Sequence, residues 1–81
     1  MLNFDDPRIK DAIISAKIDQ KYKEIILMRY GIGYEEPFSM KEIGKKFKLR
    51  GLKLREEMGK AERLAFNILK SENLADIIIK D

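Results

Sequence analysis

Apolar residues recur at helical spacing through the first part of the chain. Two acidic residues and a proline, a pattern that starts a helix, precede apolar residues one helical turn apart: Ile9, Ala12, Ile13 and Ala16. They predict a helix over residues 7–17. A second helix is predicted to begin after Asp19 and end at Gly31, since glycine is the usual residue at the left-handed position after a helix. Its inward-facing residues are predicted to be Tyr22, Ile25, Ile26 and Met28.

A third, shorter helix is predicted to begin after a loop at residues 31–37. Ser39 is followed three positions later by Glu42, which fits the capping box, in which each side chain accepts a hydrogen bond from the backbone N–H of the other residue. Ile43 and Phe47 lie one turn apart and form the buried side of this helix. A turn at residues 48–51 is predicted to end it.

The rest of the chain predicts one long helix and a short last helical segment. The long helix carries an apolar stripe: Leu54, Met58, Ala61, Ala65 and Ile68, broadened by Leu64 and Leu69. Gly59 interrupts the stripe and leaves room for a kink or for close approach of another backbone. The apolar tail at residues 74–79 either covers the core or faces a partner, since three consecutive isoleucines cannot all point inward.

These elements predict an all-α fold, a four- to five-helix bundle in a single domain over residues 1–81. The predicted shared core is Ile25, Ile26, Ile43, Phe47, Leu54, Met58 and Ala61. The chain is 44% hydrophobic and 38% charged, as expected of a small folded protein. Its 81 residues leave little room for an enclosed active-site cleft.

The sequence contains no cysteine and no histidine. Disulfides, thiolate or imidazole metal sites, cysteine nucleophiles and histidine triads are therefore excluded. We expect a protein that is not an enzyme, with no catalytic, cofactor-binding or metal-binding residues and no small-molecule substrate. No signal peptide and no apolar run near the ~18 residues that span a bilayer are present, so we also expect a cytoplasmic protein without a membrane partner.

Charge is distributed unevenly within the net charge of +3. Residues 1–40 have a net charge of −1, whereas residues 41–81 have a net charge of +4. A cluster between residues 45 and 55 contains no acidic residue and six basic ones: Lys45, Lys46, Lys48, Arg50, Lys53 and Arg55. Such a cluster suits a polyanion, because each phosphate contact releases condensed counterions. The alternative is that these residues are only the solvated face of two basic helices.

The short capped helix, the turn and the long amphipathic helix together predict a helix-turn-helix at about residues 39–70. In this motif the second helix projects its first turn into the major groove of double-stranded DNA, while the first helix crosses the backbone. We therefore expect Lys45, Lys46, Lys48 and Arg50 to contact phosphates. Lys53 and Arg55, at the start of the second helix, are expected to approach base edges.

Two motifs stand a short loop apart, MRYGIG at residues 28–33 and EPFSMKEIGKKF at residues 36–47. The residues in and just before these motifs that match a known family pattern are Ile25, Ile26, Met28, Arg29, Tyr30, Gly31, Ile32, Glu36, Pro37, Ser39, Met40, Glu42, Ile43, Gly44 and Phe47. Residues 18–49 thereby resemble the fourth region of bacterial RNA polymerase sigma factors. The resemblance implies a helix-turn-helix fold, with promoter DNA and the β-subunit flap of core RNA polymerase as partners.

Four positions depart from the sigma-factor pattern. The base-reading Glu of the family falls on Leu52, its Gln on Glu56 and its buried Ile on Glu57, while Asp19 replaces the proline that starts the preceding helix. These changes predict weaker discrimination between DNA sequences. Two hypotheses follow: a DNA-binding transcription module that docks on RNA polymerase, or a protein-interaction module of the same fold that binds polymerase or a sigma-related partner with little sequence-specific DNA binding.

Overall fold

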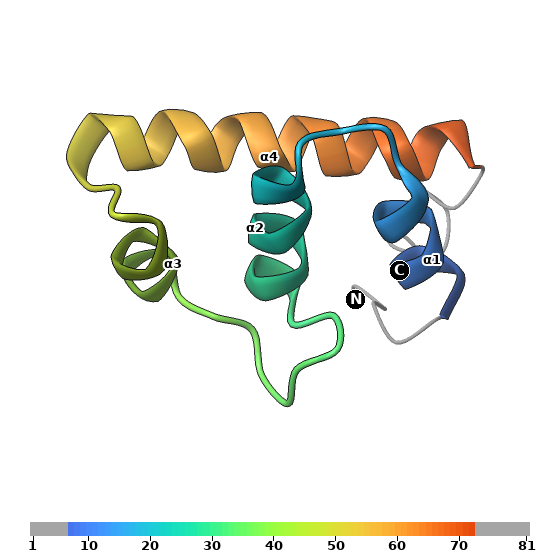
Figure 1. Cartoon of the computed structure of the whole chain (residues 1–81), viewed down its shortest axis with the longest axis horizontal. Helices are drawn as coiled ribbons and strands as arrows, with labels where there is room; N and C mark the ends of the chain where they lie inside the picture. The colour runs from blue at the N-terminus through green and yellow to red at the C-terminus, as the bar shows by residue number, and fades with distance from the viewer. Residues whose placement is uncertain (1–6, 73–81) are drawn as a thin grey trace, which may run out of the picture.

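The computed structural model describes residues 7–72, which form four α-helices and no strand (Figure 1). The helices are α1 (Pro7–Ser15), α2 (Gln20–Tyr30), α3 (Met40–Phe47) and α4 (Gly51–Ser71). The predicted all-α fold is confirmed for this part of the chain, and each helix lies where the apolar spacing placed it. The acidic pair before Pro7 and the apolar tail at residues 74–79 lie outside the described residues.

The long helix α4 forms one side of the molecule, and the three shorter helices lie along it (Figure 1). In Figure 1, α3 lies nearest the start of α4, α2 near its middle and α1 near its end. Each of the three packs against α4, and α2 also contacts both α1 and α3, whereas α1 and α3 do not touch. At 1.5 Å per residue α4 is about 30 Å long, so it is long enough for all three shorter helices to pack against it.

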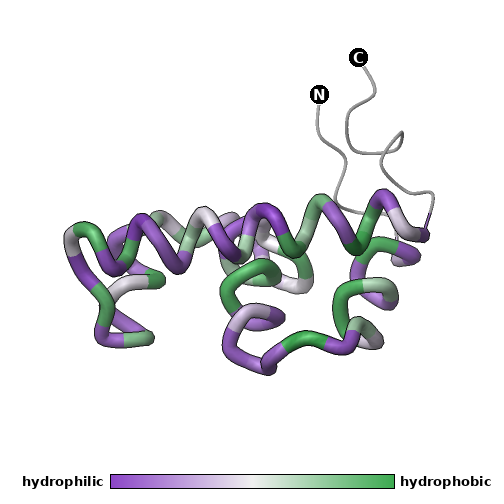
Figure 2. Tube along the Cα trace, turned by 90° about the horizontal axis from the view of Figure 1, so that it is seen from above, coloured by the Kyte–Doolittle hydropathy of each residue, from purple (hydrophilic) through white to green (hydrophobic). Residues whose placement is uncertain are grey.

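The core draws apolar side chains from all four helices. Its largest fully buried members are all isoleucines: Ile9, Ile13, Ile25, Ile26 and Ile43. Met58, Ala61, Ala65 and Leu69 complete it from α4, whose hydrophobic and hydrophilic stretches alternate along the helix (Figure 2). The predicted core is confirmed, with Phe47 and Leu54 packed against it and partly buried.

The helix ends follow the predicted chemistry, with two differences. Gly31 ends α2 in the left-handed conformation, and a Cβ there would lie 2.9 Å from the Pro37 backbone nitrogen, so only glycine fits. The first helix ends at Ser15 instead of residue 17. Asp19 precedes α2, but its side chain makes no capping hydrogen bond.

Helix α4 continues through Gly59 without another backbone near it. A Cβ at Gly59 would meet only the tip of Arg63, at 3.9 Å, so the close approach that this glycine allowed does not occur. Among residues 7–72, no helix is long and apolar enough to cross a lipid bilayer.

Candidate nucleic-acid interface

The first turn of α3 is fixed by the predicted capping box. The Ser39 Oγ accepts a hydrogen bond from the Glu42 backbone N–H at 3.1 Å, and the Glu42 Oε1 accepts one from the Ser39 backbone N–H at 2.9 Å. The backbone N–H of Ser39, followed by the Ser39 side chain, holds the pKa of the Glu42 carboxyl below its usual value. The start of α3 is therefore fixed by the local sequence Ser39 to Glu42.

A tight turn joins α3 to α4. Lys48 ends α3 with a left-handed φ of 57°, and the Leu49 backbone N–H donates to the Gly44 carbonyl oxygen at 2.8 Å. A Cβ at Gly44 would lie 2.6 Å from the Leu49 carbonyl oxygen and 2.9 Å from Leu54 Cδ2. Glycine at position 44 therefore allows α3 to pack this closely against the turn and the start of α4. We call α3, this turn and the first residues of α4 up to Arg55 the α3–α4 corner.

All six predicted DNA-binding residues lie in the α3–α4 corner and are exposed to solvent. They are Lys45, Lys46, Lys48, Arg50, Lys53 and Arg55. Of these six residues, only Lys53 forms an ion pair with a carboxylate among residues 7–72, and the other five form none. Exposed cations that form no ion pair with the described carboxylates favour a positive potential at this corner.

The corner divides these cations between different surfaces. Lys45, Lys48 and Arg50 line one groove between α3 and the start of α4. Lys46 lies outside that groove, with its Nζ 5.9 Å from the centroid of the Phe47 ring. Lys53 points toward Glu57, and Arg55 lies on the exposed side of α4.

The groove has an apolar floor and a basic rim. It encloses about 770 Å³, and Met40, Leu49 and Leu54 supply its apolar surface. Lys41 joins the three cations of its rim, and no carboxylate lines it. Lys41 was not among the predicted DNA-binding residues, although it stands one helical turn before Lys45 on α3.

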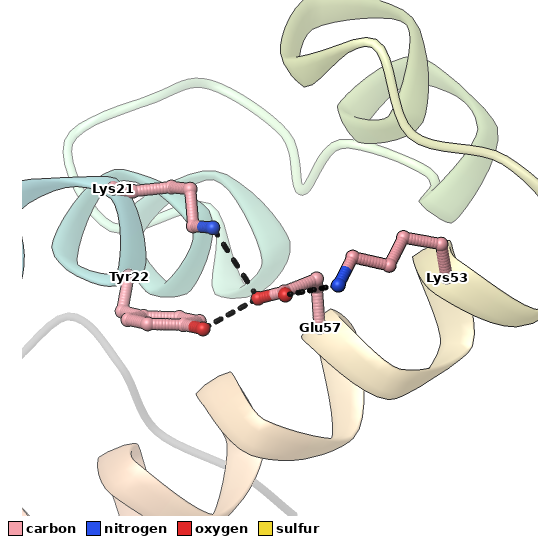
Figure 3. Close-up of polar contacts among 4 residues, drawn as sticks. All are labelled: Lys21, Tyr22, Lys53 and Glu57. Atoms are coloured by element: carbon pink, nitrogen blue, oxygen red, sulfur yellow. Dashed lines mark hydrogen bonds and ion pairs between the residues drawn. The ribbon is translucent and has the colours of Figure 1, made fainter.

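A second polar arrangement links α2 to α4 (Figure 3). The buried Glu57 carboxylate accepts a hydrogen bond from the Tyr22 hydroxyl at 2.5 Å and is 3.5 Å from Lys21 Nζ and 3.7 Å from Lys53 Nζ. The Tyr22 hydrogen bond and then the two lysines lower the pKa of Glu57, against the opposing effect of burial. We call these four residues the Tyr22–Glu57 cluster. Lys60 extends it, with its Nζ 5.2 Å from the centroid of the Tyr22 ring.

The position of Glu57 corrects an expectation drawn from the resemblance. The resemblance places Glu57 where the family has a buried Ile, and the sequence predicts that this acid, like Glu56, weakens discrimination between DNA sequences. Glu57 is instead only 9% exposed and lies beside Met58 on the packed face of α4. The signal was present in the sequence, since Glu57 stands three residues after Leu54 and four before Ala61. Its partner Tyr22 could not be found this way, because 35 residues separate them.

The described residues hold no group of three or more acidic side chains arranged to bind a metal ion. The site is therefore described by two features, a basic corner with an apolar groove and a charged cluster that joins α2 to α4. No protein-family model, curated protein or solved structure matches this chain.

Proposed function

We propose that this protein binds double-stranded DNA through a helix-turn-helix formed by α3, the turn and α4. The observation that carries the proposal is the set of five exposed cations in the α3–α4 corner, none of which forms an ion pair with a carboxylate among residues 7–72. Like charges held close together repel one another, and a polyanion relieves that repulsion with release of its counterions. The proposed role is that of a binding module rather than an enzyme.

The proposed docking places the start of α4 in the major groove and α3 across the backbone. Lys45, Lys46, Lys48 and Arg50 then contact phosphates on either side. Arg55 is the better of the two candidates for a base contact, because Lys53 must first leave its ion pair with Glu57. Leu52 is 71% exposed in the same turn and suits the methyl group of a thymine.

A direct test uses a fluorescently labelled duplex and anisotropy over a salt titration. We expect binding at low salt that weakens linearly in log affinity against log salt, since phosphate contacts dominate. Leu52→Glu should increase the preference between duplex sequences, because a carboxylate accepts a hydrogen bond from cytosine N4. Failure to bind any duplex at low salt would overturn the proposal.

The resemblance to sigma factors adds a proposed second partner, the β-subunit flap of core RNA polymerase. One observation favours a protein-interaction module as the alternative: Leu52, where the family has a base-reading carboxylate, is a large exposed apolar side chain. A leucine at this position cannot accept a hydrogen bond from a base, so one means of reading the DNA sequence is lost. A pull-down with core polymerase, run beside duplex titrations of several sequences, separates the two functions. The alternative predicts binding of polymerase or a sigma-related partner with little preference between duplex sequences.

A further inference from the structure

We propose that the groove of the α3–α4 corner docks an acidic segment of a partner protein, anchored by an apolar side chain. The groove encloses about 770 Å³, within the range of about 300–1,000 Å³ that is typical of ligand sites. Its floor is apolar and its rim is basic, and together they determine which kind of ligand can bind.

The floor is apolar and accessible. Met40 is 37% exposed although it is a large apolar residue, and Leu49 and Leu54 are only partly buried. Gly44 also lines the groove, and its lack of a side chain lets Leu49 and Leu54 pack closely against α3. A hollow of this kind is filled favourably by an apolar side chain, which removes both surfaces from water.

The rim is entirely cationic. Lys41, Lys45, Lys48 and Arg50 line the groove, all are exposed, and none forms an ion pair with a carboxylate among residues 7–72. An occupant that fills the floor must therefore carry acidic residues on both sides of its apolar anchor. Complementary charge of this kind steers association and fixes the orientation of the bound segment.

A protein segment fits these features better than DNA does. Phosphates gain from protruding cations but nothing from an apolar floor, whereas an acidic segment with a Phe or Leu anchor uses both. Docking there covers Lys45, Lys48 and Arg50, so it excludes DNA from the corner. This competition rests on the proposed DNA binding, but the docking itself does not.

The test uses labelled synthetic peptides and the full chain. The probe peptide has one Phe and one Leu flanked by Asp and Glu residues, and the control peptide has Ser in place of Phe and Leu. We expect the probe to bind and the control to bind at least about fivefold more weakly. The amide signals of Gly44 and Gly51, which line the groove, should shift on binding, whereas those of Gly33 and Gly59 should not.

Two matched variants locate the contact. Lys41→Glu reverses a rim charge near the start of α3, where an acidic residue suits the helix, so the fold should be retained. Lys46→Glu makes the same charge change on the same helix outside the groove. Lys41→Glu should weaken peptide binding by about fivefold to tenfold and Lys46→Glu by less than about twofold. Met40→Gln should weaken binding of the probe peptide but not binding of the control peptide.

Competition with an unlabelled duplex completes the experiment. Displacement of the peptide by the duplex supports the shared surface, and peptide binding without any duplex binding would leave the docking intact while overturning the proposed function. Three results would overturn the docking proposal: no peptide binding, equal losses from Lys41→Glu and Lys46→Glu, or equal affinity for the two peptides. A duplex that binds while the peptide does not would assign the groove to DNA.

Discussion

The Tyr22–Glu57 cluster and the α3–α4 corner differ in whether their lysines are paired with a carboxylate. In the Tyr22–Glu57 cluster, Lys21 and Lys53 share a buried carboxylate that also accepts a hydrogen bond from Tyr22. In the α3–α4 corner, Lys45 and Lys48 have no such partner among residues 7–72. The protein therefore carries lysines that are paired with a carboxylate within the fold and lysines that are not.

We therefore expect the paired charges to contribute to folding stability and the unpaired charges to contribute to binding. A buried carboxylate on α4 that interacts with a hydroxyl and a lysine of α2 holds the two helices together, because loss of the hydroxyl removes its closest hydrogen-bond donor. The unpaired cations of the corner repel one another and gain nothing from folding. The comparison predicts that variants of the cluster change stability, whereas variants of the corner cations change binding.

The largest effect is expected at the glycine that shapes the corner. Gly44→Ala should lower the free energy of unfolding by about 1–3 kcal/mol, because the added Cβ would lie 2.6 Å from the Leu49 carbonyl oxygen. Gly59→Ala is the matched control in α4, where the site is open and the helix propensity of alanine should add up to about 1 kcal/mol. Urea denaturation measures both. Equal effects of the two substitutions would contradict the close packing at Gly44.

The next largest effect is expected in the cluster. Tyr22→Phe should cost about 1–2 kcal/mol, since Glu57 then loses its closest hydrogen-bond donor while staying buried. Tyr34→Phe is the control, because Tyr34 is 46% exposed in a loop. Denaturation midpoints compare them. A cost for Tyr22→Phe no larger than that for Tyr34→Phe would show that the cluster does not hold α2 to α4.

A smaller loss is expected from the cap of α3. Ser39→Ala should cost about 1 kcal/mol, because it removes the acceptor of the Glu42 backbone N–H. Ser71→Ala, at the exposed end of α4, is the control and should have little effect. Thermal unfolding followed by circular dichroism would detect the difference. An unchanged midpoint for Ser39→Ala would mean that the capping box does not stabilise the corner.

The smallest expected effect is a pH dependence. The pKa of Glu57 is lowered from 4.5 in the folded protein, so its carboxylate stabilises the fold above pH 4.5. This contribution is lost as the pH falls from 4.5 through the lower pKa of the folded state. Glu57→Gln should therefore lose less stability than the natural chain over that range. Glu42 has a pKa shift of the same sign, so part of the acid sensitivity should remain. Parallel pH curves would contradict the role assigned to Glu57.

Local sequence chemistry predicted the helices because each signal acts over a few residues. Ser39 and Glu42 form the expected capping box, Gly31 is left-handed, and the apolar spacing identified Ile25, Ile26 and Ile43 as core residues. The corner cations were found in the same way, as an uninterrupted run of positive charge.

The tertiary contacts could not be predicted, because they depend on how the helices cross. The Tyr22–Glu57 hydrogen bond joins residues 35 positions apart, and the separation of Lys45 from Lys46 depends on which side of α3 faces α4. The groove itself exists only because Gly44 lets α3 approach Leu54. Residue types alone placed Lys45 and Lys46 in the same phosphate-contacting group, although only Lys45 lines the groove.

The most direct test of the central claim compares the salt dependence of duplex binding for Lys45→Gln and Lys60→Gln. Both changes remove one positive charge, but Lys45 is unpaired in the corner whereas Lys60 lies over the Tyr22 ring. If the corner binds DNA, Lys45→Gln should flatten the slope of log affinity against log salt by about one unit, and Lys60→Gln should leave it unchanged. Equal slopes for the two variants would contradict the claim that the unpaired cations of the α3–α4 corner form the DNA-binding surface.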